Sequence, residues 1–304
     1  MPLYLAIDAG GTKTNCLLAD DTHILARAST GTIKLQRVSE EEATTRLQTM
    51  LKEVAATAGV SLDRVTRTCI GLAGISIPAV QTWAHQVIPA MVSGELLLAG
   101  DEEIALDAAF PGAPGILVIA GTGSNVIGRA ADDAIYQVGG WGPALGDEGS
   151  GFWIGHEALR TCFWAKDRNI PTAMLDEIAE LWGTKSIGEI VEKANARPGP
   201  DLPALAPIVA RCADAGDELA NAVLERAGIE LAEQVALVAL KMKESGPLRK
   251  IEAAYTGSVL EHIPQVRSAT IKALKSSSPN VEVREGTVDA LEGALWRARE
   301  AAEL

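Results

Sequence analysis

Two short turns rich in glycine and threonine are the parts of this sequence best suited to bind phosphate. The first is Gly10-Gly11-Thr12-Lys13-Thr14, and the second is Gly121-Thr122-Gly123-Ser124. Each follows an apolar run, and such turns expose successive backbone amides and small hydroxyls that attract phosphate oxygens. Neither is a Walker A loop, because no Gly-Lys-Ser/Thr opens a helix. The sequence therefore predicts a phosphate site made by two opposed hairpin turns.

Asp8 is the candidate metal ligand. It ends the apolar run just before the first turn. A carboxylate at that point can hold hydrated Mg²⁺, which often needs only one or two carboxylates together with phosphate. Lys13 adds a positive charge nearby. The alternative interpretation is a plain hairpin in which Asp8 and the glycines only shape the turn.

Acidic residues also stand before two predicted helices. Asp101 follows a strand-like run and opens the acidic sequence Asp101-Glu102-Glu103. Asp147-Glu148 lies in the glycine-rich region 139–150, ahead of another predicted helix. Aspartate is favoured as a helix N-cap, so capping explains both positions without chemistry. In the same region Trp141 fits a hydrophobic plug.

The two turns belong to a repeated layout of apolar run, turn, apolar run and Asp-Asp turn. In this alignment Gly11 pairs with Gly123, Thr12 with Ser124, and Asp20-Asp21 with Asp132-Asp133. Two turns matching in order indicate two related halves, each opening with a β-meander.

Strand and helix patterns alternate after the first meander, which indicates an α/β fold with a parallel or mixed sheet. The Pro- and Gly-rich stretch 110–115 separates the halves. We expect an N-terminal domain over 1–114 and a C-terminal domain over 115–288. The second half is richer in predicted helix, which indicates a helical insertion. The closing helix, 289–304, is expected to pack back on the first domain.

Composition excludes several classes of protein. The 304 residues carry 27 basic and 40 acidic side chains, and the net charge of −13 opposes binding to nucleic acid or anionic lipid. No apolar run reaches the roughly 18 residues of a membrane span. The N-terminus does not resemble a signal peptide, so we expect a cytoplasmic location. The four cysteines are widely spaced, which favours packing roles over a metal site.

These motifs, in this order, resemble the BadF/BadG/BcrA/BcrD-type ATPase family and most closely its N-acetylglucosamine kinase branch. The resemblance covers essentially the whole chain, because Tyr255-Thr256-Gly257-Ser258-Val259 looks like the family's adenosine-side turn. It implies two actin-like (ribonuclease H-like) domains with a cleft between them, in which MgATP and a sugar bind.

The resemblance also implies roles for individual residues. Asp101 is the implied general base, and Asp8 is implied to act through Mg²⁺. The implied nucleotide-binding residues are Gly10, Gly11, Thr12, Lys13, Thr14, Gly121, Thr122, Gly123, Ser124, Gly257 and Ser258. The implied sugar-binding residues are Gly140, Trp141, Asp147 and Thr122.

The function implied is ATP-dependent phosphorylation of a hydroxyl on N-acetylglucosamine or a related hexosamine. The alternative is an ATPase that activates a partner reductase or dehydratase, but such activators carry cysteines for an iron–sulfur cluster shared across a dimer. The family's aminosugar kinases usually have a sugar-contacting Asn after the third strand, where this chain has Thr32, Lys34 and Gln36. There are two interpretations of Lys34: it binds an acidic substituent on the sugar, or it is a solvated surface lysine. The resemblance also favours a homodimer.

Overall fold

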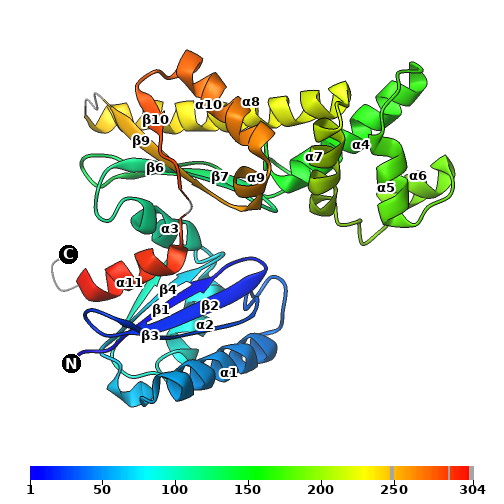
Figure 1. The fold of residues 1–304 in the computed structure, drawn as a ribbon. Coiled ribbons are helices and arrows are strands. Elements are labelled where there is room, and N and C mark those ends of the chain that lie inside the picture. The colour runs from blue at the N-terminus through cyan, green and yellow to red at the C-terminus, as the bar shows by residue number, and fades with distance from the viewer. Residues whose placement is uncertain (247–249, 287, 301–304) are drawn as a thin grey trace. The chain divides into compact units, whose positions relative to one another are not determined.

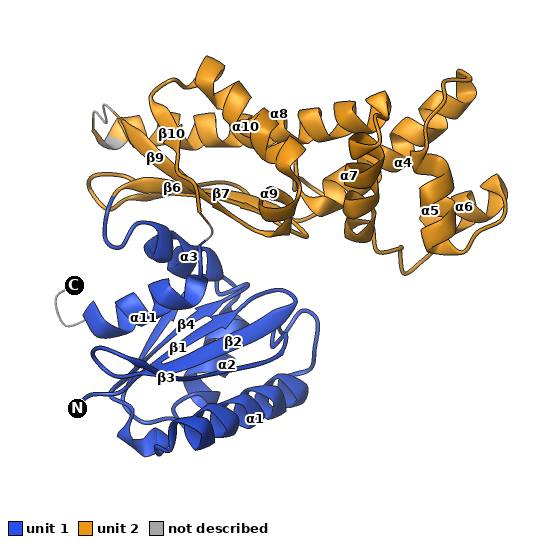
Figure 2. Ribbon diagram, in the orientation of Figure 1, with its two compact units in different colours: residues 1–113, 288–304 blue, residues 114–287 orange. Residues whose placement is uncertain are grey.

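The computed structural model describes residues 1–246, 250–286 and 288–300 (Figure 1). It divides into two compact units (Figure 2). Unit 1 comprises residues 1–113 and 288–304, and unit 2 comprises residues 114–287. The chain therefore returns to unit 1 for its last helix, and the break falls within the Pro- and Gly-rich stretch.

Unit 1 contains a five-stranded mixed sheet in the order β3-β2-β1-β4-β5. The first three strands form an antiparallel meander, while β4 and β5 run parallel to β1. The strands are β1 (Tyr4–Ala9), β2 (Lys13–Ala19), β3 (Ile24–Gly31), β4 (Arg67–Leu72) and β5 (Glu95–Ala99).

Unit 2 repeats this topology with a sheet in the order β10-β9-β6-β7-β8. Again the first three strands form an antiparallel meander and the last two run parallel to its first strand. The strands are β6 (Gly115–Ala120), β7 (Ser124–Arg129), β8 (Ile135–Gly139), β9 (Ile251–Thr256) and β10 (Val281–Val283). The shared topology confirms the internal repeat and the α/β class.

Strand pairing corrects the residue match between the two hairpins. Thr14 lies opposite Ala9, and Ser124 lies opposite Ala120. The structural counterpart of Ser124 is therefore Thr14 and not Thr12, because the second turn is one residue shorter than the first.

Helices cover both faces of the unit 1 sheet. Alternation along β1 places Leu5 and Ile7 in a core with α1 and α2, and Tyr4 and Ala6 in a core with α3 and α11. Figure 1 shows α1 and α11 on opposite faces. The helices are α1 (Glu40–Ala58), α2 (Pro78–Val87), α3 (Asp101–Ala109) and α11 (Ala290–Glu300), with a 3₁₀ turn η1 (Leu62–Arg64).

Unit 2 carries extra helices between β8 and β9, which confirms the predicted insertion. Figure 1 shows α5 and α6 at the end of this unit that is remote from its sheet. These helices are α4 (Gly151–Asp167), α5 (Met174–Trp182), α6 (Ile187–Ala194), α7 (Ala206–Asp214) and α8 (Glu218–Met242), with the 3₁₀ turns η2 (Pro203–Leu205) and η3 (Lys243–Ser245).

Two consecutive helices follow β9, namely α9 (Ser258–His262) and α10 (Pro264–Ser277). Pro264 has no amide hydrogen to donate and starts a new helix, where its fixed φ is favourable. Within the described part of the chain, no helix combines the length and apolar character that crossing a bilayer demands.

Candidate active site

In unit 1 the candidate acidic residues lie at the carboxyl ends of three parallel strands. Asp8 of β1 pairs with Gly71 of β4, and Gly71 pairs with Ala99 of β5. Asp101 follows β5, and a Cβ added at Gly71 would lie 3.2 Å from the Asp101 Cα. The fold therefore places Asp8 and Asp101 at one edge of the sheet, where α/β proteins bind ligands.

The first glycine turn joins β1 to β2 and is held through its carbonyl groups. The Gly10 amide donates to the Lys13 carbonyl at 3.1 Å. The Thr32 hydroxyl donates to the Gly10 carbonyl at 2.9 Å, and Arg37 donates to the Gly11 carbonyl at 2.8 Å. Thr12 and Lys13 stay exposed at the tip. No pattern in the sequence pointed to Arg37, because its contact spans distant parts of the chain.

Asp8 is a largely buried carboxyl group with a perturbed pKa. Burial raises its pKa to about 6, and the negative charge of Asp289 adds to the rise. A hydrogen bond with Asn15 and the positive charge of Lys13 act in the opposite direction. No cluster of three or more acidic, His or Cys ligands occurs among the described residues. A single carboxylate together with phosphate oxygens fits Mg²⁺.

Asp101 does not cap α3 with its side chain. Gly100 is the N-cap residue, Asp101 is the first helical residue, and no side-chain capping bond forms. The capping interpretation of Asp101 is therefore wrong. Next to it, burial raises the pKa of Glu102 to about 7, and the adjacent Asp101 adds to the rise. Sequence reasoning missed Glu102, which reads as part of an ordinary acidic first turn.

The three residues at the position of the family's Asn have different surroundings. The Thr32 hydroxyl is occupied by the Gly10 carbonyl and by the Lys34 amide, which donates to it at 3.1 Å. The Gln36 side chain lies beside Gly74. The Lys34 side chain is partly buried, and its charge acts on Glu102. Lys34 is therefore the one of these three whose charge acts on the acidic residue beside Asp101.

In unit 2 the second glycine turn is fixed by the start of α4. The Gly121 amide donates to the Gly123 carbonyl at 2.9 Å. The amides of Gly151 and Phe152 donate to the carbonyls of Gly121 and Thr122, at 2.8 Å and 3.2 Å. The Ser124 hydroxyl donates to the Glu148 carbonyl at 2.8 Å. The turn and the glycine-rich region thus form one hydrogen-bonded assembly.

Asp147 is buried against that turn. It is 5% exposed and adopts a φ of 65°, which is uncommon for a residue other than glycine. A Cβ at Gly123 would lie 2.9 Å from the Asp147 Oδ2. Ser150 is the N-cap of α4, since its hydroxyl accepts from the Trp153 amide at 3.1 Å. The capping interpretation of Asp147-Glu148 is therefore wrong.

Trp141 is 73% exposed, so the hydrophobic-plug interpretation is also wrong. It follows Gly140, which has a φ of 73° and is itself exposed. The indole therefore presents a free aromatic surface, which is suited to pack against the face of a ligand.

The turn at Gly257 adjoins the second glycine turn within unit 2. Gly257 has a φ of 100°, and a Cβ there would lie 2.4 Å from the Ala120 carbonyl oxygen. Ser258 is exposed and begins α9, and a Cβ at Gly121 would lie 3.8 Å from the Ser258 hydroxyl. Only glycine fits position 257, and the close approach brings Gly257 and Ser258 beside the predicted phosphate turn.

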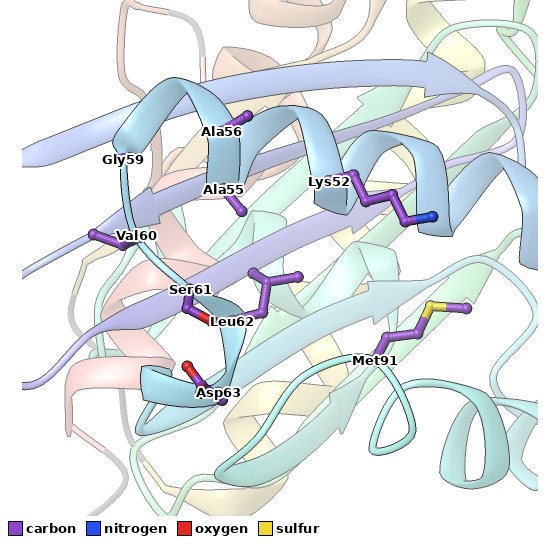
Figure 3. Close-up of a pocket in the computed structure, with 9 residues that line it drawn as sticks. All are labelled: Lys52, Ala55, Ala56, Gly59, Val60, Ser61, Leu62, Asp63 and Met91. Atoms are coloured by element: carbon purple, nitrogen blue, oxygen red, sulfur yellow. The ribbon is translucent and has the colours of Figure 1, made fainter.

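Two surface hollows contain none of the predicted site residues. One, of about 700 Å³, is bounded by the end of α1, η1 and Met91, with Lys52 and Asp63 as its charged residues (Figure 3). The other, of about 350 Å³, is lined by α4 side chains including Glu157 and Trp164. Neither supplies a phosphate-binding turn.

Comparison with known proteins identifies the family of this chain. The model of the BadF/BadG/BcrA/BcrD ATPase family matches residues 5–298. The N-acetylmuramic acid/N-acetylglucosamine kinase of Clostridium acetobutylicum is 28% identical, with 98% of this chain and 99% of that protein covered. The N-acetyl-D-glucosamine kinase of Dictyostelium discoideum is 26% identical, with 97% of each chain covered.

Solved structures share the fold. One from Chromobacterium violaceum, provisionally assigned as an N-acetylglucosamine kinase, superposes with a TM-score of 0.75 at 24% identity, covering 97% of this chain and 98% of that one. The ROK hexokinase of Thermus thermophilus superposes with a TM-score of 0.64 at 15% identity, covering 99% and 100%. The fold is therefore that of the actin-like sugar kinases. The chain belongs to the BadF/BadG/BcrA/BcrD ATPase family.

Proposed function

We propose that this protein is an ATP-dependent kinase that transfers the γ-phosphoryl group to a hydroxyl of N-acetylglucosamine or a closely related aminosugar. The observation that carries the proposal is the similarity of the whole chain to two aminosugar kinases. In addition, each of the two sheets has a glycine turn with an aspartate nearby. The two turns would bind phosphate oxygens through their amides.

Asp101 would act as the general base. The sugar hydroxyl oxygen bonds to the γ-phosphorus, the bond from that phosphorus to the β–γ bridging oxygen breaks, and the hydroxyl proton passes to the Asp101 carboxylate. ADP leaves with the electron pair of the broken bond. Most of the rate enhancement in such transfers comes from alignment and charge stabilisation, so the direction of the Asp101 carboxylate matters.

Asp8 would hold Mg²⁺ beside the first turn, with phosphate and water completing the coordination. The bound ion supplies positive charge to the transferring phosphoryl group. Lys13 at the exposed tip of the turn would contribute a second positive charge. Gly257 and Ser258 would border the nucleotide beside the second turn.

The sugar would contact the glycine-rich region of unit 2. The Asp147 carboxylate accepts hydrogen bonds from hydroxyl groups, and Gly140 and Trp141 offer exposed backbone and an indole face. Thr122 is exposed in the adjoining turn and would border both ligands. Lys34 fits a substrate with an acidic substituent, which is consistent with the N-acetylmuramic acid named for the Clostridium relative.

An activator ATPase with a shared iron–sulfur cluster is not favoured. All four cysteines are buried, and burial raises the pKa of Cys16, Cys69 and Cys162 to about 12. A buried thiol held in its protonated form is a poor ligand for a cluster at a protein surface.

A panel of hexoses and aminosugars tests the proposal. With MgATP, ADP formation should rise well above the sugar-free rate for aminosugars, and one of them should be preferred. ATP turnover that is the same with and without every sugar would contradict the kinase assignment. Light scattering at several protein concentrations tests the accompanying prediction of a homodimer.

A further inference from the structure

One side-chain amide reaches both ends of the segment 139–148 in unit 2. Gln234 belongs to α8 and is 7% exposed. Its Nε2 donates to the Glu148 carbonyl at 3.2 Å. Its Oε1 lies beside Gly139, where an added Cβ would stand 2.5 Å away. The segment between these two contacts carries most of the residues proposed to bind the sugar.

The same face of α8 packs against the residue that follows Glu148. Gly149 has a φ of 78°, and a Cβ added there would lie 2.5 Å from the Leu231 Cγ and 2.7 Å from the Ala227 carbonyl oxygen. Positions 227, 231 and 234 are four and three residues apart, so they share one helical face. Helix α8 therefore holds the end of the segment by a close backbone approach and by one hydrogen bond.

Packing alone does not explain a glutamine at position 234. Its Oε1 is buried and has no hydrogen-bond partner among the described residues. A buried polar atom without a partner lowers stability. The Glu148 carbonyl does not depend on Gln234 for a donor, because the Ser124 hydroxyl also donates to it at 2.8 Å. An apolar side chain of the same length would therefore serve stability at least as well, which indicates another role for the amide.

Asp147, which precedes Glu148, has a backbone conformation that its surroundings must hold. Its φ of 65° is uncommon for a residue other than glycine, and such conformations persist only where neighbouring contacts enforce them. The Ser150 amide donates to the Asp147 carbonyl at 3.1 Å. Gln234 and Ser124 fix the next carbonyl group along the chain. The direction of the Asp147 side chain thus depends on these donors.

We propose that Gln234 is a positioning residue for the sugar. It fixes both ends of the segment 139–148 and so sets the direction in which the Asp147 carboxylate meets the sugar hydroxyls. Its effect falls on the sugar and not on MgATP, because this segment carries none of the residues proposed to bind nucleotide. The inference rests on the proposed function, since it needs Asp147 as a sugar ligand.

The test measures the KM for sugar, the KM for MgATP, the turnover number and the melting temperature of Gln234→Met. Methionine keeps the length of the side chain but removes both the donor and the unpartnered oxygen. A displaced Asp147 would lose a hydrogen bond from the sugar, so we expect the sugar KM to rise about tenfold. The KM for MgATP and the turnover at saturating sugar should stay unchanged, and the melting temperature should stay the same or rise.

A binding measurement needs no turnover. In calorimetric titration without nucleotide, the dissociation constant of the preferred aminosugar, N-acetylglucosamine in the proposed reaction, should rise about tenfold in Gln234→Met.

Gln265→Met is the matched control. Gln265 is another glutamine of unit 2 whose Oε1 is buried without a partner among the described residues, and its Nε2 donates to Asp214 of α7. The same chemical change at this position should leave the KM and the dissociation constant for the sugar at their wild-type values.

Wild-type sugar KM and dissociation constant in Gln234→Met would overturn the inference. A rise in both KM values with a lower melting temperature would also overturn it, because that pattern indicates general loosening of unit 2. Gln234→Leu, which lacks the amide too, should repeat the result of Gln234→Met, and failure of both variants to fold would assign Gln234 to stability alone. A wild type with no sugar-stimulated ADP formation would instead contradict the proposed function.

Discussion

Asp8, the proposed Mg²⁺ ligand, is a buried carboxyl group with a raised pKa. Its pKa rises from 3.8 to about 6, first because burial removes water from the carboxylate. The folded state therefore binds this proton more tightly than the unfolded state does. That contribution to stability is complete below pH 3.8 and is lost as the pH rises through about 6. A bound cation would offset the loss, since it favours the ionised form.

This gives a prediction for Mg²⁺ binding, measured by calorimetry with a non-hydrolysable ATP analogue at several pH values. Affinity should fall by about tenfold for each pH unit below 6, because one proton competes with the ion. Asp8→Asn should bind Mg²⁺ weakly, with little dependence on pH beyond that of the nucleotide itself. Equal wild-type affinity at pH 5 and pH 7.5 would remove Asp8 from the metal site.

Substitution of Asp101 is the most direct test of the proposed general base. Because Gly100 is the N-cap and Asp101 makes no side-chain capping bond, Asp101→Asn should change the melting temperature little. Loss of a general base lowers rates by about 10²–10⁴, so we expect at least a hundredfold loss of turnover with MgATP binding retained. Steady-state kinetics and thermal melting measure both. A variant with nearly wild-type turnover would move the base assignment to Asp147.

Residue type and position singled out Asp8, whereas the roles of Asp101 and Asp147 came from the resemblance to the family. The partners of these residues were not predictable, because they come from tertiary contacts. Arg37, for example, reaches the Gly11 carbonyl from a separate loop.

At the scale of elements, the turn between β9 and α9 depends on one glycine. Gly257→Ala combines an unfavourable φ with a Cβ placed 2.4 Å from the Ala120 carbonyl oxygen. We expect a loss of roughly 1–3 kcal/mol in the free energy of unfolding from the backbone conformation. The clash should add to this loss and displace the turn, which raises the KM for ATP.

Gly216→Ala is the matched control. Gly216 has a similar φ of 92° with no atom within 4 Å of an added Cβ. It should show the backbone effect alone, with ATP KM unchanged. If both variants alter stability and KM equally in urea unfolding and kinetic assays, the contact with Ala120 does not shape the nucleotide site.

Helix boundaries were predictable where local signals agree. Helix α1 spans Glu40–Ala58, because Ser39 caps its start and Gly59 ends it in the left-handed conformation. The start of α4 was misplaced, because Asp147-Glu148 and Ser150 are both plausible caps and the hydrogen bonds among the turns decide for Ser150. Competition among nearby caps is resolved only by packing.

At the scale of the whole molecule, one topology is used twice. Each five-stranded sheet opens with a meander whose first hairpin is a glycine turn, and the internal repeat predicted this correspondence. The sequence alignment of the two halves did not show that the second glycine turn is one residue shorter than the first. The alignment was set by the Asp-Asp turns, which hides the difference in length. The arrangement divides the proposed catalytic and sugar-binding aspartates between the units, with Asp101 in unit 1 and Asp147 in unit 2.

The central claim is phosphoryl transfer to an aminosugar, and identification of the product tests it most directly. N-acetylglucosamine incubated with MgATP and the protein should yield equal amounts of ADP and a sugar phosphate, with the phosphate bonded to one hydroxyl oxygen in the ³¹P–¹H correlation spectrum. Asp101→Asn under the same conditions should yield little of either. ADP accompanied only by inorganic phosphate, with every sugar in the panel unmodified, would contradict the account.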